Sequence, residues 1–250
     1  MSAPVGTASR VTRGIGVVAL VLLGLVLLYG LVVSPADEVQ RDAVRLMYVH
    51  VPTVSVAYLA FGVTALGSAL WLWRRTRTPF WDRLAGASAE VGVLFTALTL
   101  AIGSLWGRPI WGTWWEWDAR LTTTAVLFFL YLGYLALRRT ADTVEARGKR
   151  CAIAALIAFA DVPIVHFSVT WWQTLHQDAT VFNPELDVDI HGSMAWTLVL
   201  SVVAFTVLYA YLTMSRLRLA ELEEGREQRD LELAIAERVA ADRPEPVVTG

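Results

Sequence analysis

The sequence predicts an all-α integral membrane protein with six transmembrane helices and both termini in the cytoplasm. Hydrophobic residues make up 56% of the 250 residues, only 18% are charged, and the mean hydropathy is +0.50. A soluble domain of this length carries more charge. Six apolar stretches are long enough to cross the hydrocarbon core of a bilayer, and Arg and Lys gather in alternate loops.

Each predicted span is an apolar stretch bounded by polar or basic residues. The first, at 14–33, is an apolar run of about 20 residues, the length of a transmembrane helix. The Ser-Pro-Ala-Asp sequence after it is a poor cleavage site, so we expect a retained helix rather than a signal peptide. The other spans are predicted at residues 48–73, 84–105, 121–137, 151–170 and 193–214.

The basic residues predict the orientation of these spans. Most Lys and Arg near helix ends lie in the N-terminal segment 1–13, the loops at 74–83 and 138–150, and the start of the tail. Basic loops stay in the cytoplasm, so the opposite loops, including a tryptophan-rich one, face outward. Residues 14–214 thus form a six-span membrane domain.

The C-terminal tail, residues 215–250, alternates Leu and Ala with Glu and Arg but keeps no clean heptad. This pattern favours a solvated cytoplasmic helix over a coiled coil or a partner-docking helix. From Pro244 onward the composition predicts disorder.

The stretch Trp106-Gly-Arg-Pro-Ile-Trp-Gly-Thr-Trp-Trp-Glu-Trp-Asp-Ala-Arg120 contains five of the eleven tryptophans. If it is helical, Trp111 and Trp115 share one face, as do Trp114 and Asp118. Such a platform, with one carboxylate, suits a large planar ligand with apolar faces and charged edges. The alternative is an interfacial aromatic belt, but belts are usually scattered over several helix ends.

Four histidines, His50, His166, His176 and His191, are all expected on the outward side. Neutral imidazole is a common ligand of haem iron, so the clustered histidines and the aromatic platform predict a haem site. For any one histidine alone, a helix-end residue bonded to backbone or water is the ordinary interpretation. The cations available for haem propionates, or alternatively for lipid headgroups, are Arg41, Arg45, Arg108 and Arg120.

Several function classes have no support in the sequence. The net charge of −2 argues against a nucleic-acid partner, and the single cysteine, Cys151, excludes an internal disulfide and a CxxCH haem-attachment motif. No glycine-rich phosphate loop or HExxH motif is present, so we expect a protein that is not an enzyme. Asp161, predicted within the fifth span, is either a functional carboxylate or a packing contact at a proline-bent helix end.

Three segments resemble one known family. Residues 106–122 closely resemble the tryptophan-rich "WWD" signature of haem-handling proteins in cytochrome c maturation. Met47-Tyr-Val-His-Val-Pro52 and Pro163-Ile-Val-His-Phe-Ser-Val-Thr-Trp-Trp-Gln-Thr-Leu-His-Gln177 resemble the histidine segments of the CcmC family. The resemblance covers about residues 15–215.

The resemblance implies a protein that holds haem b at the outer face of the cytoplasmic membrane. It implies delivery of that haem to the chaperone CcmE, with the CcmA/CcmB ATPase complex and the small protein CcmD as further partners. The implied axial ligands of the iron are His50 and His176, one near a helix start and one in a loop, which allows haem to be gripped and later released. The implied platform comprises Trp106, Trp111, Trp114, Trp115, Trp117, Asp118 and Arg120, with His166, Arg45 and Arg108 close by.

Three alternative functions remain open at this stage. A CcmF- or CcsA-like haem lyase carries further spans or histidines, and an electron-transfer cytochrome subunit usually holds haem between histidines inside facing helices. A solute transporter has only Asp161 as a hint. The haem content of the purified protein separates the haem-binding functions from the transporter.

Overall fold

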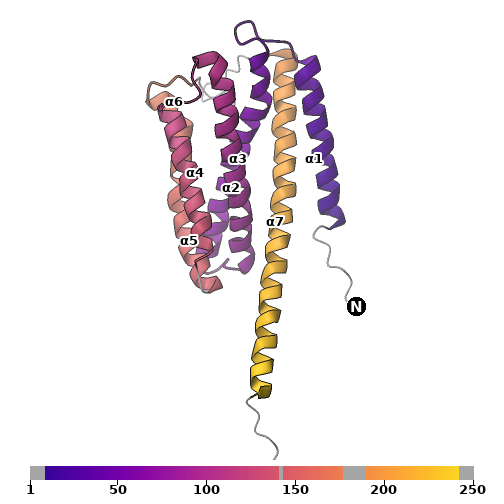
Figure 1. Cartoon of the computed structure of the whole chain (residues 1–250), viewed down its shortest axis with the longest axis vertical. Helices are drawn as coiled ribbons and strands as arrows, with labels where there is room; N and C mark the ends of the chain where they lie inside the picture. The colour runs from indigo at the N-terminus through magenta and orange to yellow at the C-terminus, as the bar shows by residue number, and fades with distance from the viewer. Residues whose placement is uncertain (1–8, 141–142, 177–189, 242–250) are drawn as a thin grey trace, which may run out of the picture.

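The structure, a computed structural model, describes residues 9–140, 143–176 and 190–241. It is an elongated helical bundle, with α4, α5 and α6 on one side and α1 on the other (Figure 1). The helices are α1 (Arg10–Leu28), α2 (Met47–Leu72), α3 (Pro79–Trp111), α4 (Ala119–Arg138), α5 (Val144–Phe159), α6 (Asp161–Trp171) and α7 (Gly192–Ala241). A π-helical turn (Tyr29–Val33) extends α1, and a 3-10 helix (Asp42–Leu46) leads into α2.

The predicted six spans are confirmed: within the described ranges, six helical segments are long and apolar enough to cross a membrane. Several boundaries differ from the prediction, and the third and sixth spans show it most clearly. Helix α3 is longer at both ends than residues 84–105, since proline is tolerated at its first position and Pro109 lies only in its last turn. Helix α7 runs on to Ala241, so the sixth span and the predicted tail helix are one continuous helix. The expected disordered end lies outside the described residues.

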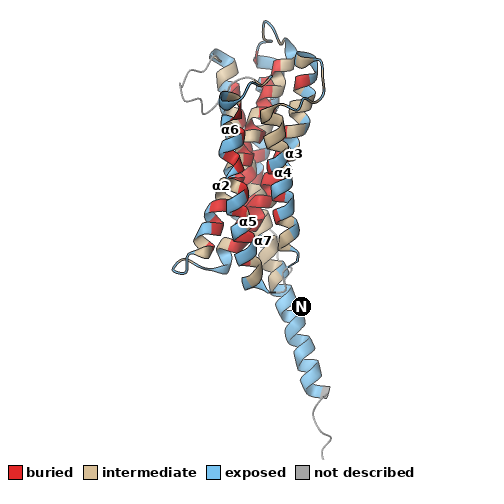
Figure 2. Ribbon diagram, turned by 90° about the vertical axis from the view of Figure 1, so that its left-hand side faces the viewer, coloured by how far each residue is buried: buried red, intermediate tan, exposed pale blue. Residues whose placement is uncertain are grey.

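Buried side chains concentrate where α2 packs against its neighbours, and the outer faces of the bundle stay exposed and apolar (Figure 2). Ser88 on α3 donates to the Ala60 carbonyl of α2 at 2.8 Å, and Thr99 donates to Thr53 at 3.0 Å. Phe61 of α2 stacks on Tyr131 of α4 with ring centroids 3.7 Å apart. Small side chains and interhelical hydrogen bonds are what hold helices together in lipid.

The fifth span is interrupted between α5 and α6. The Ala160 N–H donates to the Ile157 carbonyl at 3.2 Å, a tighter i→i−3 bond. Pro163, in the first turn of α6, has no N–H and cannot donate to the carbonyl four residues earlier. Asp161 begins α6 at this interruption, and it is buried.

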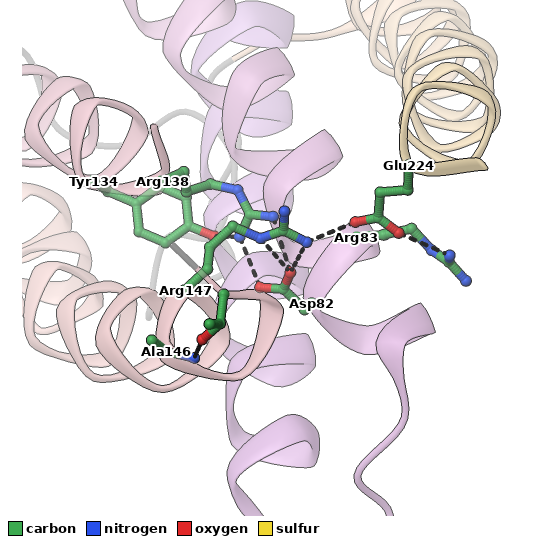
Figure 3. A network of polar contacts seen from close by, with 8 residues as sticks. Asp82, Arg83, Tyr134, Arg138, Ala146, Arg147 and Glu224 are labelled. Atoms are coloured by element: carbon green, nitrogen blue, oxygen red, sulfur yellow. Dashed lines mark hydrogen bonds and ion pairs between the residues drawn. The ribbon is translucent and has the colours of Figure 1, made fainter. Parts of the chain in front are cut away.

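At one end of the bundle, which we call the basic end, a buried ion-pair network joins four helices (Figure 3). Asp82 of α3 accepts from both terminal nitrogens of Arg138 at 2.8 and 3.1 Å. It also accepts from Arg147 of α5 at 3.0 Å. Glu224 of α7 bonds Arg147 and Arg83. This network ties the starts of α3 and α5 and the end of α4 to the middle of α7. The opposite end carries the tryptophan-rich segment and is called the tryptophan end.

Candidate functional site

A cavity of about 300 Å³ lies at the tryptophan end, between α2, α3, α4 and α6. Its volume is at the lower end of the range for small-molecule sites. The wall is mostly apolar, with a few polar groups that converge on the same space. Three of the histidines, three of the tryptophans and one arginine line it, namely His50, His166, His176, Trp106, Trp111, Trp115 and Arg120.

Two of these histidines face each other from different elements. His50 lies in the first turns of α2, and His176 lies in the segment that follows α6. Their ring centroids are 6.3 Å apart with an interplanar angle of 34°. The main-chain N–H of His176 donates to the Thr174 hydroxyl at 2.9 Å, which forms a tight local turn. This pair thus has one imidazole on a helix and one on a loop.

His50 is held closely by α3. Only 8% of the residue is exposed, and a Cβ added at Gly103 would lie 2.9 Å from the His50 Cε1 atom. Glycine is therefore needed at position 103 for α3 to approach the imidazole. The His50 Nδ1 atom is buried without a hydrogen-bond partner among the described residues.

Two tryptophans brace the histidine pair. Trp106 packs edge-on against His50 at 5.7 Å, and its indole N–H donates to Gln40 at 2.9 Å. Trp111 packs edge-on against His176 at 6.1 Å. Both come from the last turns of α3, one on each side of the pair. They fix the directions of the two rings from one rigid element.

Arg120 supplies positive charge to the cavity. It lies in the first turn of α4, where its guanidinium donates to the His166 carbonyl at 2.7 Å. It also interacts electrostatically with His50 and with Tyr58. The arginine thus ties α4 to α6 and places a cation beside the imidazoles.

The predicted helical platform is wrong. Helix α3 ends at Trp111, and Gly112 caps it with a φ of 77°, a left-handed conformation that favours glycine. Residues 113–118 are not helical, so the i,i+4 pairs expected for Trp111 with Trp115 and Trp114 with Asp118 do not form a helix face. The Gly-Thr sequence after Trp111 breaks the helix, and this local turn outweighs the aromatic spacing.

The five tryptophans consequently divide into two groups. Trp106, Trp111 and Trp115 line the cavity, whereas Trp114 and Trp117 point outward and are 58% and 76% exposed. Trp115 and Trp117 remain in contact, edge to face, at 5.4 Å. The segment therefore presents an inner aromatic wall and an outer aromatic surface.

Asp118 caps a helix. It is the N-cap of α4, and its carboxylate accepts from the Leu121 N–H at 2.8 Å. An acidic N-cap satisfies an orphan donor and complements the helix dipole. Asp118 does not line the cavity, and it acts through the position of α4, on which Arg120 lies.

Three other candidate residues from the sequence, Arg45, Arg108 and His191, lie away from the cavity. Arg45 bonds Asp42 and the carbonyls of Gly30 and Ser34, which secures the loop between α1 and α2. Arg108 donates to the Gly112 carbonyl at 2.6 Å and lies over the Trp114 ring. His191 is exposed beside the start of α7. None of these three lines the cavity.

Sequence reasoning did not single out Tyr58, Thr99, Gly103 or Leu175, all of which line the cavity. Tyr58 packs edge-on against His166 at 6.2 Å. Residues 99 and 103 are four apart on α3, and 103 is three before Trp106. That helical spacing on a tryptophan-bearing face is the one sequence signal that could have identified Thr99 and Gly103.

Comparison with known proteins identifies the family of this chain. The family model described as CcmC, heme exporter protein C, matches residues 3–232. That match spans most of the chain, including all six spans and the cavity. The chain belongs to the CcmC family.

Individual CcmC proteins show the same extent of similarity. Heme exporter protein C of Haemophilus influenzae is 40% identical over 205 residues, which is 82% of each chain. That of Bradyrhizobium diazoefficiens is 38% identical over 225 residues, 89% of this chain and 82% of the relative. That of Escherichia coli K12 is 35% identical over 207 residues, 82% of this chain and 81% of the relative.

Proposed function

We propose that this CcmC-family protein is a haem-binding component of cytochrome c maturation. It binds haem b in the cavity at the tryptophan end and delivers it to the chaperone CcmE. In this proposal the tryptophan end lies at the outer face of the cytoplasmic membrane, and the CcmA/CcmB complex and CcmD are its further partners. Its role is transport and hand-over rather than catalysis.

The main support for the proposal is the distance between the ring centroids of His50 and His176. A first-row metal bonds an imidazole nitrogen at about 2 Å, so two imidazoles on opposite sides of one metal place their ring centroids about 6 Å apart. The observed separation is 6.3 Å. A porphyrin supplies four nitrogens of its own and needs only two from the protein. Because Nδ1 of His50 is buried, Nε2 is the nitrogen that we assign to the iron.

The remaining groups of the cavity suit the other parts of haem. The apolar wall and the rings of Trp111 and Trp115 suit the porphyrin faces. The guanidinium of Arg120 suits a propionate carboxylate. Trp114 and Trp117, exposed on the outer surface, provide a site where the chaperone can contact the protein.

The test is a transfer experiment with purified protein. Haem is added to the protein in detergent, and the Soret and visible bands are recorded before and after the apo form of the chaperone is added. We expect a six-coordinate spectrum that is lost from this protein as haem moves to the chaperone. A protein that forms no haem complex contradicts the proposed function, and a complex that never transfers contradicts the delivery step alone.

The proposed orientation has its own test, which uses two matched substitutions. Glu116→Cys lies at the tryptophan end and Glu145→Cys at the basic end, and both positions are exposed. The one native cysteine, Cys151, is buried and gives little background. A membrane-impermeant maleimide added to intact spheroplasts should label Glu116→Cys only, because basic helix ends stay in the cytoplasm. Labelling of Glu145→Cys in intact cells, or of both positions, contradicts the orientation.

A further inference from the structure

The four walls of the cavity are not equally closed. Helix α2 packs along α3, α3 packs along α4, and α4 packs along α6. The fourth wall is formed by α2 and α6, and these two described helices meet at Tyr58 and His166 without packing closely along their lengths. Among the described helices, α6 packs mainly against α4 and the end of α5. We call this fourth side the α2–α6 seam.

The seam begins where the fifth span is interrupted. Before the interruption, α5 packs against both α2 and α4. After it, α6 packs mainly against α4. The seam therefore lies beside α6 and not beside α5.

The residues of the seam both line the cavity and remain partly exposed. On α2 they are Val51, Val54, Ser55 and Tyr58, and on α6 the corresponding residue is His166. The rings of Tyr58 and His166 meet edge to face at 6.2 Å and narrow the seam at its inner end. The small side chain of Ser55 lies about one turn before Tyr58 on α2 and also lines the cavity.

The seam faces lipid rather than water. Tyr58 lies about 16 Å along α2 from its first residue, at 1.5 Å per residue, well inside a span that is long and apolar enough to cross the membrane. The residues that flank the seam on its outer side are apolar and exposed, namely Leu59 on α2 and Ile164 and Phe167 on α6. Exposed apolar side chains at this depth contact acyl chains.

We propose that the α2–α6 seam is a lateral entrance through which haem passes from the outer leaflet of the bilayer into the cavity. The proposal rests on the haem-binding function proposed above. A planar molecule with apolar faces can slide edge-on between two helices that do not pack closely along their lengths. Its carboxylates then reach Arg120, and its iron reaches the space between His50 and His176. The aqueous alternative is entry past the segment that holds His176.

The experiment narrows the seam with a bulky side chain and compares two sources of haem. Ser55→Trp fills the seam, and Leu59→Trp, one turn further along α2 on the lipid-facing side and outside the cavity wall, is the matched control. Each protein is reconstituted in lipid nanodiscs. Haem is supplied either dissolved in the nanodisc lipid or from water as an albumin complex, and loading is followed by the growth of the Soret band.

The expected result is specific to one variant and one source. With haem supplied in lipid, Ser55→Trp should slow loading about ten-fold or more, the effect of a barrier raised by about 1.4 kcal/mol. Leu59→Trp should load like the unaltered protein. With haem supplied from water, the rates of all three proteins should agree.

Three outcomes would contradict the proposal that the α2–α6 seam is a lateral entrance for haem. They are an unchanged rate for Ser55→Trp in the lipid arm, an equal slowing of Ser55→Trp in both arms, and an unaltered protein that loads from water only. If the unaltered protein binds haem from neither source, the proposed function itself fails. Ser55→Leu, a smaller change, should give an intermediate rate and keeps the test valid if the tryptophan variant does not fold.

Discussion

Replacing either His50 or His176 by glycine is expected to abolish the six-coordinate haem spectrum of the purified protein. Each substitution removes one of the two imidazoles whose ring centroids lie 6.3 Å apart in the cavity. Loss of one metal bond should weaken haem retention at least about ten-fold, which corresponds to about 1.4 kcal/mol of binding free energy. Added imidazole should partly restore the spectrum, since it fills the space that the side chain leaves. The measurements are the Soret position and the haem that remains after gel filtration.

Two other histidines provide the controls for this experiment. His191→Gly changes an exposed residue outside the cavity wall and should leave the spectrum unaltered. His166→Gly changes a residue whose ring packs against Tyr58 and should keep six-coordinate haem. If His166→Gly, rather than His176→Gly, is the variant that responds to imidazole, the second ligand has been assigned to the wrong residue.

Replacing Asp82 by alanine is expected to have the largest effect on stability. The Asp82 side chain is 4% exposed and accepts hydrogen bonds from two arginines, Arg138 and Arg147. Removal of one partner from a buried ion pair leaves an uncompensated charge and costs about 3–5 kcal/mol. Asp82→Ala should therefore lower the free energy of unfolding by an amount in that range, measured by denaturant titration in detergent micelles.

The matched control is the same substitution in an exposed pair. The Asp230 side chain is 69% exposed and lies 3.8 Å from Arg226 on the same helix. Exposed pairs contribute little, so Asp230→Ala should change the free energy of unfolding by less than about 1 kcal/mol. Equal destabilisation by the two substitutions would show that the Asp82 network does not hold the basic end together.

The sequence was sufficient to predict the spans, because apolar length and the distribution of arginines are local properties of the chain. The sequence did not predict the places where a single residue interrupts a regular pattern of side chains. Gly112 ends α3, so the tryptophans after it do not share a helix face. The fifth span is divided into α5 and α6 close to Pro163. In both places one backbone constraint decided the geometry, and the regular spacing of the side chains did not reveal it.

The cavity was only partly predictable for a different reason. The histidines and tryptophans stand out by residue type, and the resemblance to CcmC named the pair His50 and His176. Their approach depends on contacts between segments more than 100 residues apart in the chain. Gly103 and Tyr58 are common residue types in a membrane helix, and only the approach of α3 to His50 and the ring contact of Tyr58 with His166 give them a place in the site.

Helix α7 is continuous in shape but not in stability. Up to Glu224 it is held by the bundle and by the ion pairs to Arg83 and Arg147. Beyond that residue it projects about 25 Å further, at 1.5 Å per residue, past the rest of the molecule, and its side chains are almost all exposed (Figure 2). Most of the stability of a helix in a protein comes from packing, which this part lacks. One unbroken helix therefore joins a half that the bundle stabilises to a half that only a binding partner could stabilise further.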